Sequence, residues 1–533
     1  MAVQGEKATK QSMIREIPLV TVVEPKYLPS KQHLCHYCFE FTTSTSLSSI
    51  HRCDSCEQSW YCSEECQKSD WAAWHRAECQ HFKKANWQVF QSGGTTVVDK
   101  FVLMETARSY FVMILRLFLM QKAGNLADVK GQRFGRTFKD LPTGKVLAAK
   151  SDQTKLTKLF SKIFPTVILK ESDTQFLRRA LQIVKVNSRL LYHYSITGEP
   201  IIVGRFLGLD LCCIKHNCRA NAAMISRGRE VFVIPDSDSL DLSDPTSVTV
   251  NYFLEQLDPQ TQHDAANTVY EITSCPCSYC SPSEEGYLEA FDIICPTCTA
   301  MFPVDPTAGC QLRCDNCRDP VTAEDSVALR RFFQLMPQLM TCYQEAPFTA
   351  AYPVYVAPVL HLLSRQTYFR WRILCAATKQ LIMIRELARR DMIPLMVSWT
   401  TQDAKKWIQE SAAAWADTDL YENPYVPQNL WQYLTAAFIA ASEHQWSEAE
   451  NYLDKARWIV EKYFSRIGEQ KFPFFQTIRY LGRCILMGSV KKKNPAKFKL
   501  YEWFRYRPGA ESLEATGILT SPDFGSLFQL SIQ

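Results

Sequence analysis

A dense run of cysteines between residues 35 and 79 constrains this chain more than any other feature of its sequence. Its eight candidate metal ligands are Cys35, Cys38, Cys53, Cys56, Cys62, Cys66, His75 and Cys79. A C-x2-C pair turns tightly enough to place two thiolates on one tetrahedral ion. A segment of about 45 residues buries too little apolar surface to fold alone, whereas each structural zinc ion contributes on the order of 10 kcal/mol. The sequence therefore predicts two zinc ions in this segment.

The rest of the chain favours reduced thiols over disulfides. Its 533 residues include 21 cysteines, and fifteen of these occur in short, metal-like spacings. The first twenty residues are too polar for a signal peptide. The most apolar run, 110–120, is too short for a membrane span and carries Arg116. We therefore expect an intracellular protein, cytoplasmic or nuclear, with no membrane contact.

The first cysteine run resembles the MYND zinc finger. The residues that carry the resemblance are Tyr61-Cys62-Ser63, Cys66-Gln67, Trp71, His75 and Cys79. In that family the ligand pairs interleave, which implies two sets: Cys35, Cys38, Cys62 and Cys66 for one zinc, and Cys53, Cys56, His75 and Cys79 for the other. The resemblance also implies protein partners, in particular proline-rich peptides. A RING finger is disfavoured because the only histidine is the seventh of the eight ligands.

A change of pattern follows the finger. Residues 98–122 and 172–186 show helical periodicity, and the polar stretch 123–145 is expected to be a loop between them. Residues 187–252 instead contain short β-rich runs separated by Gly, Asp and Ser. The chain therefore combines helices and strands in successive segments.

A second cysteine group, CPCSYC, contributes Cys275, Cys277 and Cys280. Three thiolates leave a tetrahedral site incomplete. Cys218 is the expected fourth ligand, although an isolated cysteine is more often a buried core thiol. We therefore predict a third zinc ion that joins distant parts of the chain.

This arrangement resembles a SET domain with its post-SET loop, and the finger inserted early in the chain is similar to the family that combines SET and MYND modules. The motif of that family that supplies the post-SET cysteine matches Lys215-His216-Asn217-Cys218. Tyr252 matches its active-site tyrosine, and Asn187 matches an asparagine that contacts the cofactor. The resemblance covers residues 11–280 well and the remainder loosely. It implies transfer of a methyl group from S-adenosylmethionine to a protein lysine.

A further pair of motifs, CPTC and CDNC, has the spacing of a zinc ribbon. Its predicted ligands are Cys295, Cys298, Cys314 and Cys317, which brings the expected total to four zinc ions. Cys310 is left over as a packing residue or a competing ligand. Beyond residue 325 helical patterns dominate, and 429–464 resembles a tetratricopeptide (TPR) helix pair.

These features predict an α+β fold: a split, β-rich SET domain with an inserted MYND finger, a post-SET zinc loop, a zinc ribbon and a helical TPR-like lobe. The expected boundaries are 1–33 for the first, truncated SET segment, 34–80 for the finger, 81–186 for a helical insert, 187–270 for the SET core, 271–320 for the post-SET and ribbon cysteines, and 321–533 for the helical lobe.

The methyl-donor site departs from the family pattern. The family has a G-x-G segment before the finger, and Gly5 alone cannot form it. Lys215 replaces an asparagine, and Thr273 replaces an aromatic residue that packs near the cofactor or the lysine channel. If the Lys215 ammonium lies about 5 Å from a positive charge of the donor, their repulsion costs roughly 3 kcal/mol at an effective dielectric constant of 20. The alternative is that Lys215 pairs with the carboxylate of the donor. These departures favour impaired catalysis.

Two functions remain open at this stage. The first is a docking platform that acts through its finger and helical lobe. The second is an active methyltransferase that binds S-adenosylmethionine through Asn187, Lys215 and His216 and modifies histone or other lysine-containing proteins with the help of Tyr252. Tyr252 and His216 are equally compatible with core packing. Binding to nucleic acid is disfavoured, because the finger mixes acidic and basic residues and the net charge is only +5.

Overall fold

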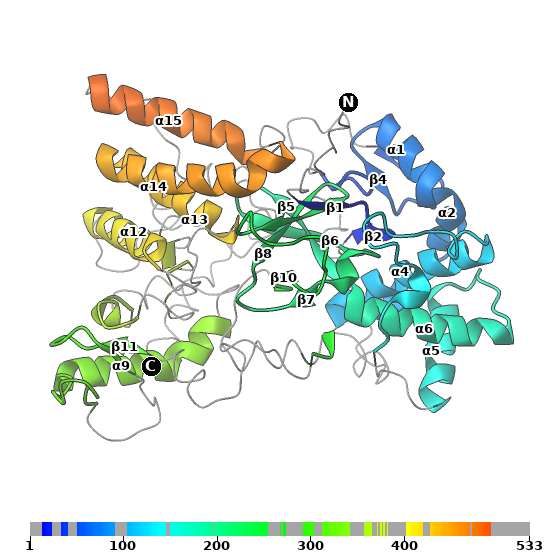
Figure 1. The fold of residues 1–533 in the computed structure, drawn as a ribbon, viewed down its shortest axis with the longest axis horizontal. Coiled ribbons are helices and arrows are strands. Elements are labelled where there is room, and N and C mark those ends of the chain that lie inside the picture. The colour runs from blue at the N-terminus through cyan, green and yellow to red at the C-terminus, as the bar shows by residue number, and fades with distance from the viewer. Residues whose placement is uncertain are drawn as a thin grey trace, which may run out of the picture. The chain divides into compact units, whose positions relative to one another are not determined.

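The computed structural model describes residues 13–23, 34–40, 51–90, 104–144, 150–195, 197–253, 267, 270–272, 292–302, 312–341, 356–364, 370, 374–375, 377–378, 381, 401–418, 427–468 and 472–491. The chain divides into two compact units, which we treat separately (Figure 1). The first comprises Met1–His193, Pro200–Phe253 and His263–Pro276, and the second comprises Tyr194–Glu199, Leu254–Gln262 and Cys277–Gln533. The six boundaries expected from the sequence are finer than this division and stay predictions.

Two β-sheets lie in the centre of the first unit. The larger has the strand order β1 (Ile14–Glu16), β9 (Glu230–Pro235), β8 (Ala222–Arg227), β10 (Thr249–Val250) and β7 (Lys215–His216). The smaller has the order β2 (Val20–Val23), β6 (Pro200–Leu207) and β5 (Arg189–Tyr194). Strand β10 runs parallel to β7 with Val250 opposite His216. This pairing brings His216 close to the residues that follow β10, including Tyr252.

The β8–β9 hairpin turns at Gly228, which has a φ of +57°. A glycine at the first central position of a two-residue loop suits the right-handed twist of the flanking strands. A Cβ atom on Gly228 would also lie 2.8 Å from the carbonyl oxygen of Cys38. The hairpin therefore approaches the first cysteine pair of the finger so closely that only glycine fits without a shift.

The finger consists of a small hairpin and a bent helix. Strands β3 (His51–Arg52) and β4 (Trp60–Tyr61) pair antiparallel. Helix α1 (Glu64–Asp70) continues through a π-helical turn (Trp71–His75) into α2 (Arg76–Lys83). The helix begins at Ser63, whose hydroxyl accepts a hydrogen bond from the Cys66 N–H at 3.2 Å, as expected for a helix cap.

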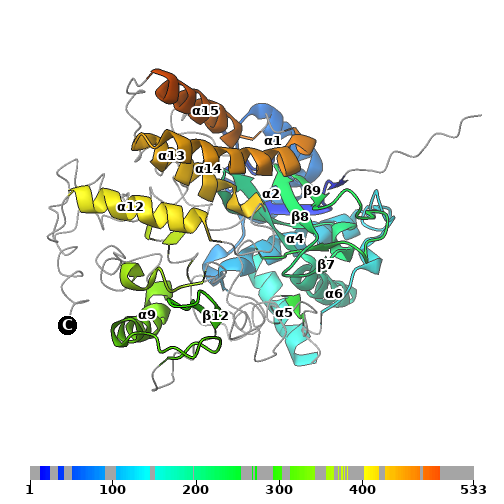
Figure 2. The same cartoon turned by 60° about the vertical axis from the view of Figure 1, so that its left-hand side comes forward.

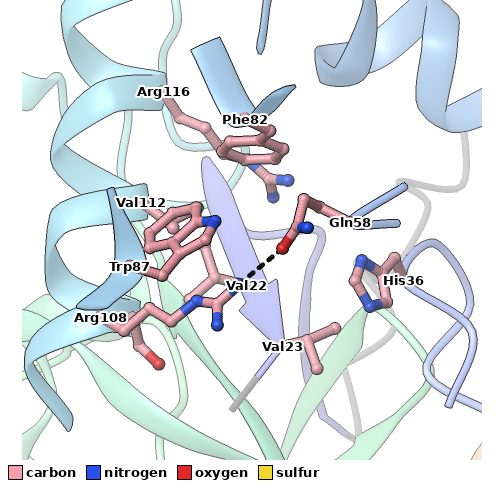
Figure 3. Close-up of a pocket in the computed structure, with 10 residues that line it drawn as sticks. Val22, Val23, His36, Gln58, Phe82, Trp87, Arg108, Val112 and Arg116 are labelled. Atoms are coloured by element: carbon pink, nitrogen blue, oxygen red, sulfur yellow. Dashed lines mark hydrogen bonds between the residues drawn. The ribbon is translucent and has the colours of Figure 1, made fainter. Parts of the chain in front are cut away.

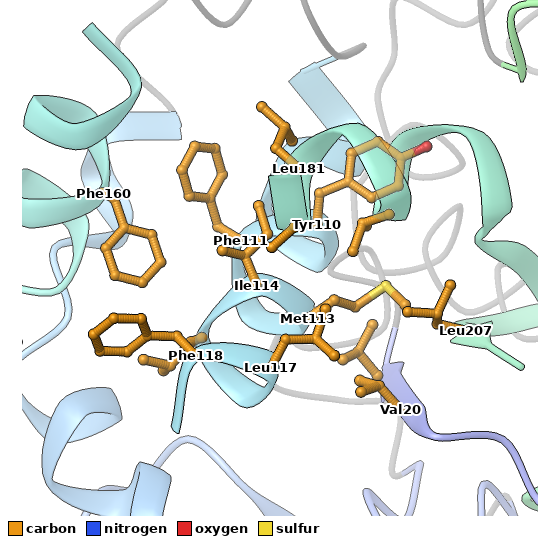
Figure 4. Packing of buried hydrophobic residues seen from close by; sticks show 14 of the residues in the cluster. Val20, Tyr110, Phe111, Met113, Ile114, Leu117, Phe118, Phe160, Leu181 and Leu207 are labelled. Atoms are coloured by element: carbon orange, nitrogen blue, oxygen red, sulfur yellow. The ribbon is translucent and has the colours of Figure 1, made fainter. Parts of the chain in front are cut away.

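Three helices pack beside the finger: α4 (Met104–Lys122), α5 (Lys150–Ile163) and α6 (Glu171–Asn187). Figure 4 shows how Phe111, Ile114 and Phe118 of α4 meet Phe160 of α5 and Leu181 of α6. The helices expected at 98–122 and 172–186 correspond to α4 and α6, whereas α5 was not singled out within the helical insert expected at 81–186. None of the described helices is long and apolar enough to cross a membrane.

Arg116 interrupts the apolar face of α4 because it has a partner in the finger. Its guanidinium holds the Glu78 carboxylate of α2 in a two-pronged ion pair, with Nε–Oε1 and Nη2–Oε2 distances of 2.6 and 3.0 Å. Both side chains are buried. The pair therefore fixes the end of the finger to the helical insert.

Within the residues that the structure describes, the second unit is mainly helical and contains one small sheet. Strands β11 (Ile293–Ile294) and β12 (Met301–Phe302) precede α9 (Ala323–Thr341), and the later helices are α12 (Thr401–Ala416), α13 (Leu430–Ser442), α14 (Trp446–Ile459) and α15 (Phe474–Lys491). Figure 2 shows α12 to α15 side by side. The other short helical turns among the described residues are Trp87–Phe90, Phe138–Asp140, Leu211–Cys213, Ala357–Val359, Pro427–Asn429, Val460–Phe464 and Ser465–Ile467.

Helices α13 and α14 form the helix pair expected at 429–464. Ala437, Ala449, Leu453 and Ala456, the positions that suggested a TPR unit, are all buried. One helix pair is too little to distinguish a TPR array from another helical lobe. The described helices and sheets confirm the mixed helix-and-sheet class. The fold alone does not test the SET and TPR-like assignments.

Candidate functional site

The first group of predicted ligands, Cys35, Cys38, Cys62 and Cys66, forms a compact tetrad with all ligand atoms within 4.8 Å of one another. The Cys38–Cys62 and Cys62–Cys66 sulfur distances are 3.6 and 3.5 Å. These distances suit a tetrahedral ion with zinc–sulfur bonds of about 2.3 Å. A tight turn supplies the first pair, since the Phe39 N–H donates to the Cys35 carbonyl at 3.0 Å and Phe39 has a φ of +61°.

The second group, Cys53, Cys56, His75 and Cys79, forms a fully buried tetrad. Cys53 and Cys79 place their sulfur atoms 3.7 Å apart, and His75 Nε2 lies 3.4 Å from the sulfur of Cys56. The other ring nitrogen, Nδ1, lies 3.4 Å from the hydroxyl of Ser59. A second ring contact of this kind orients a metal-binding imidazole.

The chemistry of these tetrads fits zinc. Burial raises the pKa of Cys56 and of Cys62 to about 12, and the charge of neighbouring thiolates adds to the effect. A nearby cation would therefore be needed to ionise Cys56 and Cys62 near neutral pH, whereas burial already favours the neutral, metal-binding form of His75. A divalent zinc ion supplies that charge and matches the Cys and His donor set.

A third tetrad lies in the second unit and consists of Cys295, Cys298, Cys314 and Cys317. The Cys295–Cys317 and Cys298–Cys314 sulfur distances are 3.7 and 3.5 Å. Thr299 and Arg318 follow the two C-x2-C pairs with φ values of +60° and +65°, so both pairs use the same tight turn as the finger. Cys310 lies outside the described residues. The structure thus brings together twelve of the predicted ligands and supports the prediction of zinc.

The predicted post-SET site cannot be assembled from the described part of the chain, because Cys275, Cys277 and Cys280 lie outside it, as does Thr273. Cys218 is buried, and its sulfur lies 3.0 Å from His216 Nε2. The fourth zinc ion therefore stays a prediction.

Of the four residues expected at the active site, two are in contact with each other in the structure. His216 and Tyr252 lie together, with ring centroids 5.2 Å apart, and the Tyr252 N–H donates to His216 Nδ1 at 3.2 Å. The Tyr252 hydroxyl donates to the carbonyl oxygen of Ile214. Both side chains are buried. His216 and Tyr252 thus form one centre in which their polar atoms contact the protein itself.

Asn187 and Lys215 are placed differently. The side-chain amide of Asn187 donates to the carbonyls of Pro142 and Ile183 at 2.7 and 2.9 Å, and the side chain is buried at the end of α6. Lys215 is exposed on β7. Solvent therefore screens the charge of Lys215, so the electrostatic cost estimated from the sequence is an upper limit.

Arg189 is a residue of this centre that sequence reasoning missed. Its guanidinium carbon lies 3.5 Å from the ring centroid of Tyr252 and 4.8 Å from that of Tyr270. It also donates to the carbonyl oxygens of Val186 and Ser188 at 2.8 and 3.1 Å, and only 4% of the residue is exposed. No spacing motif marks Arg189, because its aromatic partners come from other parts of the sequence. Its position at the start of a β-rich run was the only available signal.

Comparison with known proteins adds three findings. The family model of the MYND finger matches residues 35–79. SET domain-containing protein 14 of Caenorhabditis elegans is 23% identical over 252 residues, which are 46% of this chain and 50% of that protein. Protein-lysine N-methyltransferase SMYD4 of Homo sapiens and of Pongo abelii is 30% identical over 82 residues, which are 13% of this chain and 10% of that protein. The chain thus spans half the length of the nematode relative and a tenth of the other two.

Proposed function

We propose that this protein, a zinc-binding MYND protein of the SET-and-MYND family, acts mainly as a protein-docking platform whose methyl-donor site is impaired. The observation that carries the proposal is the position of Arg189 against Tyr252. The finger offers complete zinc ligand sets, whereas the centre that would perform methyl transfer contains a buried cation of its own.

The charge of Arg189 opposes the reaction of the resembled family. Both S-adenosylmethionine and an unreacted lysine carry a positive charge. At about 5 Å and an effective dielectric constant of 20, each like-charge contact costs roughly 3 kcal/mol. The Tyr252 hydroxyl, which would orient the lysine nitrogen, is hydrogen-bonded to Ile214. These contacts support weak donor binding and poor orientation of the lysine.

A pair of ligands tests this explanation. S-adenosylhomocysteine has the shape of S-adenosylmethionine without its sulfonium charge. On zinc-replete protein, calorimetry should give at least tenfold tighter binding of the uncharged ligand, and Arg189→Met should narrow the difference. Micromolar binding of S-adenosylmethionine that is lost in Asn187→Ala would contradict the proposal.

The docking function is supported by an exposed aromatic ring on the finger. Trp71 is 44% exposed, and its ring lies 5.9 Å from that of His75. Proline-rich peptides bind exposed aromatic surfaces because their extended helix is preformed. Trp71→Ala should weaken binding of a proline-rich peptide at least tenfold in fluorescence titration. Trp458→Ala is the matched control, because that ring is 42% exposed in the second unit.

The alternative is an active protein-lysine methyltransferase. It is favoured by the proximity of His216 and Tyr252, the two residues matched to the active site of the family. Transfer of labelled methyl groups from S-adenosylmethionine to lysines of histone or other proteins, lost in Tyr252→Phe, would establish it. The substrate would then be identified by mass spectrometry of the labelled lysine.

A further inference from the structure

A small cavity of the first unit lies between the finger, strand β2 and helix α4 (Figure 3), and its lining includes neither Tyr252 nor His216. Its volume is about 40 Å³, room for roughly three water molecules if each needs 10–15 Å³. Half of its lining residues are apolar or aromatic: Val22, Val23, Phe82, Trp87 and Val112. The other half are polar or charged: His36, Gln58, Arg108, Ser109 and Arg116.

The two arginines of the cavity differ in how their charge is balanced. Arg116 is held by the carboxylate of Glu78. Arg108 instead contacts two neutral groups: it donates to the side-chain oxygen of Gln58 at 3.3 Å, and its guanidinium carbon lies 3.9 Å from the Trp87 ring centroid. Among the side chains that the structure describes, Arg108 forms no ion pair with a carboxylate.

Arg108 is partly exposed, and its hydrogen bond to Gln58 uses only one of its guanidinium nitrogens. Burial lowers the pKa of Arg108 to about 10, so the site costs free energy to hold the charge. The Gln58 oxygen is occupied by Arg108, so the Gln58 amide nitrogen remains as a second donor beside it. A planar guanidinium matches a carboxylate in two parallel hydrogen bonds.

We propose that this cavity binds a carboxylate carried on a short aliphatic stem. The carboxylate of the ligand contacts the Arg108 guanidinium and the Gln58 amide. Its aliphatic stem lies against the apolar lining, which includes Val22, Val112, Phe82 and Trp87. The ligand is either a small free carboxylic acid or an acidic side chain or C-terminus of a bound peptide, since both present the same group. This site does not depend on methyl transfer or on binding of proline-rich peptides.

Butyrate and butyramide form the direct test, because they have the same size and differ in charge. Titration of zinc-replete full-length protein, followed by ligand-observed NMR, should show butyrate binding at least tenfold more tightly than butyramide. An acidic peptide that competes with butyrate would identify a peptide source, and butyrate binding without such competition would identify a free acid. Equal binding of butyrate and butyramide, or phosphate binding as tightly as butyrate, would overturn the proposal.

Two variants locate the binding to this cavity. Arg108→Met keeps the length of the side chain and should reduce butyrate affinity at least tenfold, while Arg479→Met, which removes an exposed arginine beside Phe475, should leave it unchanged. Gln58→Glu provides a second route if Arg108→Met unfolds, because the new carboxylate would pair with Arg108 and exclude butyrate. Unchanged butyrate affinity in a folded Arg108→Met or Gln58→Glu variant would show that the cavity is not the site.

Discussion

The finger and the centre around Tyr252 are both buried, yet their polar atoms are used in opposite ways. In the finger, thiols and one imidazole converge on each other at 3.4–3.7 Å, a geometry that a cation between them would stabilise once the thiols ionise. In the centre, the Tyr252 hydroxyl and the Arg189 guanidinium bind backbone carbonyls. Burial alone therefore does not distinguish the two kinds of site. A ligand site has polar side-chain atoms that point toward a common centre, whereas in the centre around Tyr252 these atoms form hydrogen bonds with the protein backbone.

Removal of zinc should produce the largest effect and should affect the finger first. Each structural zinc contributes on the order of 10 kcal/mol, so exhaustive chelation should unfold residues 51–90. Metal analysis and near-ultraviolet circular dichroism measure the outcome. Cys56→Ser should cost one zinc per chain. Cys212→Ser should cost none, because that buried thiol donates to the Gly208 carbonyl outside any tetrad. A finger that keeps its fold without metal would remove the basis of the comparison.

The ion pair between Arg116 and Glu78 should give the next largest effect. Glu78→Gln leaves the Arg116 charge buried without its partner and should lower the free energy of unfolding by about 3–5 kcal/mol. Denaturant unfolding measures it. The double variant Glu78→Leu, Arg116→Met removes both charges and should recover more than half of the loss. A loss under about 1 kcal/mol in the single variant would mean that water reaches the pair.

The stability of the β-sheets of the first unit should depend on pH, whereas that of the finger depends on metal. The Glu16 carboxylate accepts hydrogen bonds from the N–H groups of Leu209, Asp210 and Leu211, but burial outweighs them and raises its pKa from 4.5 to about 7. The folded state then binds the proton more tightly than the unfolded state. Its stabilising contribution is complete below pH 4.5 and is lost as pH rises through 7, by about 3 kcal/mol.

Glu16→Gln tests this assignment because it removes the titration and keeps the size of the side chain. The variant should flatten the decline of unfolding free energy between pH 5 and 7.5, measured on zinc-replete protein. An unchanged slope would assign the pH dependence to another group.

Replacing a buried tyrosine by phenylalanine in each region should give the smallest difference in the free energy of unfolding. Tyr61 of the finger donates to the buried Asp70 carboxylate at 2.8 Å, whereas Tyr252 donates to a backbone carbonyl. Tyr61→Phe should cost about 2 kcal/mol, because its acceptor is charged, and Tyr252→Phe about 1 kcal/mol. Thermal unfolding compares them. The reverse order would indicate that the Tyr252 hydroxyl has a larger role than its single contact suggests.

The sequence predicted the parts of the site that depend on local spacing. C-x2-C pairs form tight turns by themselves, so the turn at Cys35–Cys38 and both ribbon pairs followed from the sequence, while the interleaving of the finger ligands came from the resemblance to a family. The helical and β-rich segments were also predicted, since their periodicity is local. Arg189 and the Arg116–Glu78 pair were not, because their contacts join segments far apart in the chain. Helix α5 lies within the helical insert expected at 81–186, but its bounds were not given.

The π-helical turn Trp71–His75 sets how the finger responds to changes of length. It contains one residue more than an α-helical turn would need; His75 is its last residue and Cys79 lies four residues beyond it. Each residue of an α-helix advances the chain by about 100°, so loss of one residue between Trp71 and Trp74 would swing both donors away from Cys53 and Cys56 together. An exchange of side chains at Ala72 or Ala73, which are exposed, leaves that phase intact. Single-residue deletions in this short stretch should therefore be far more damaging than substitutions at the same positions.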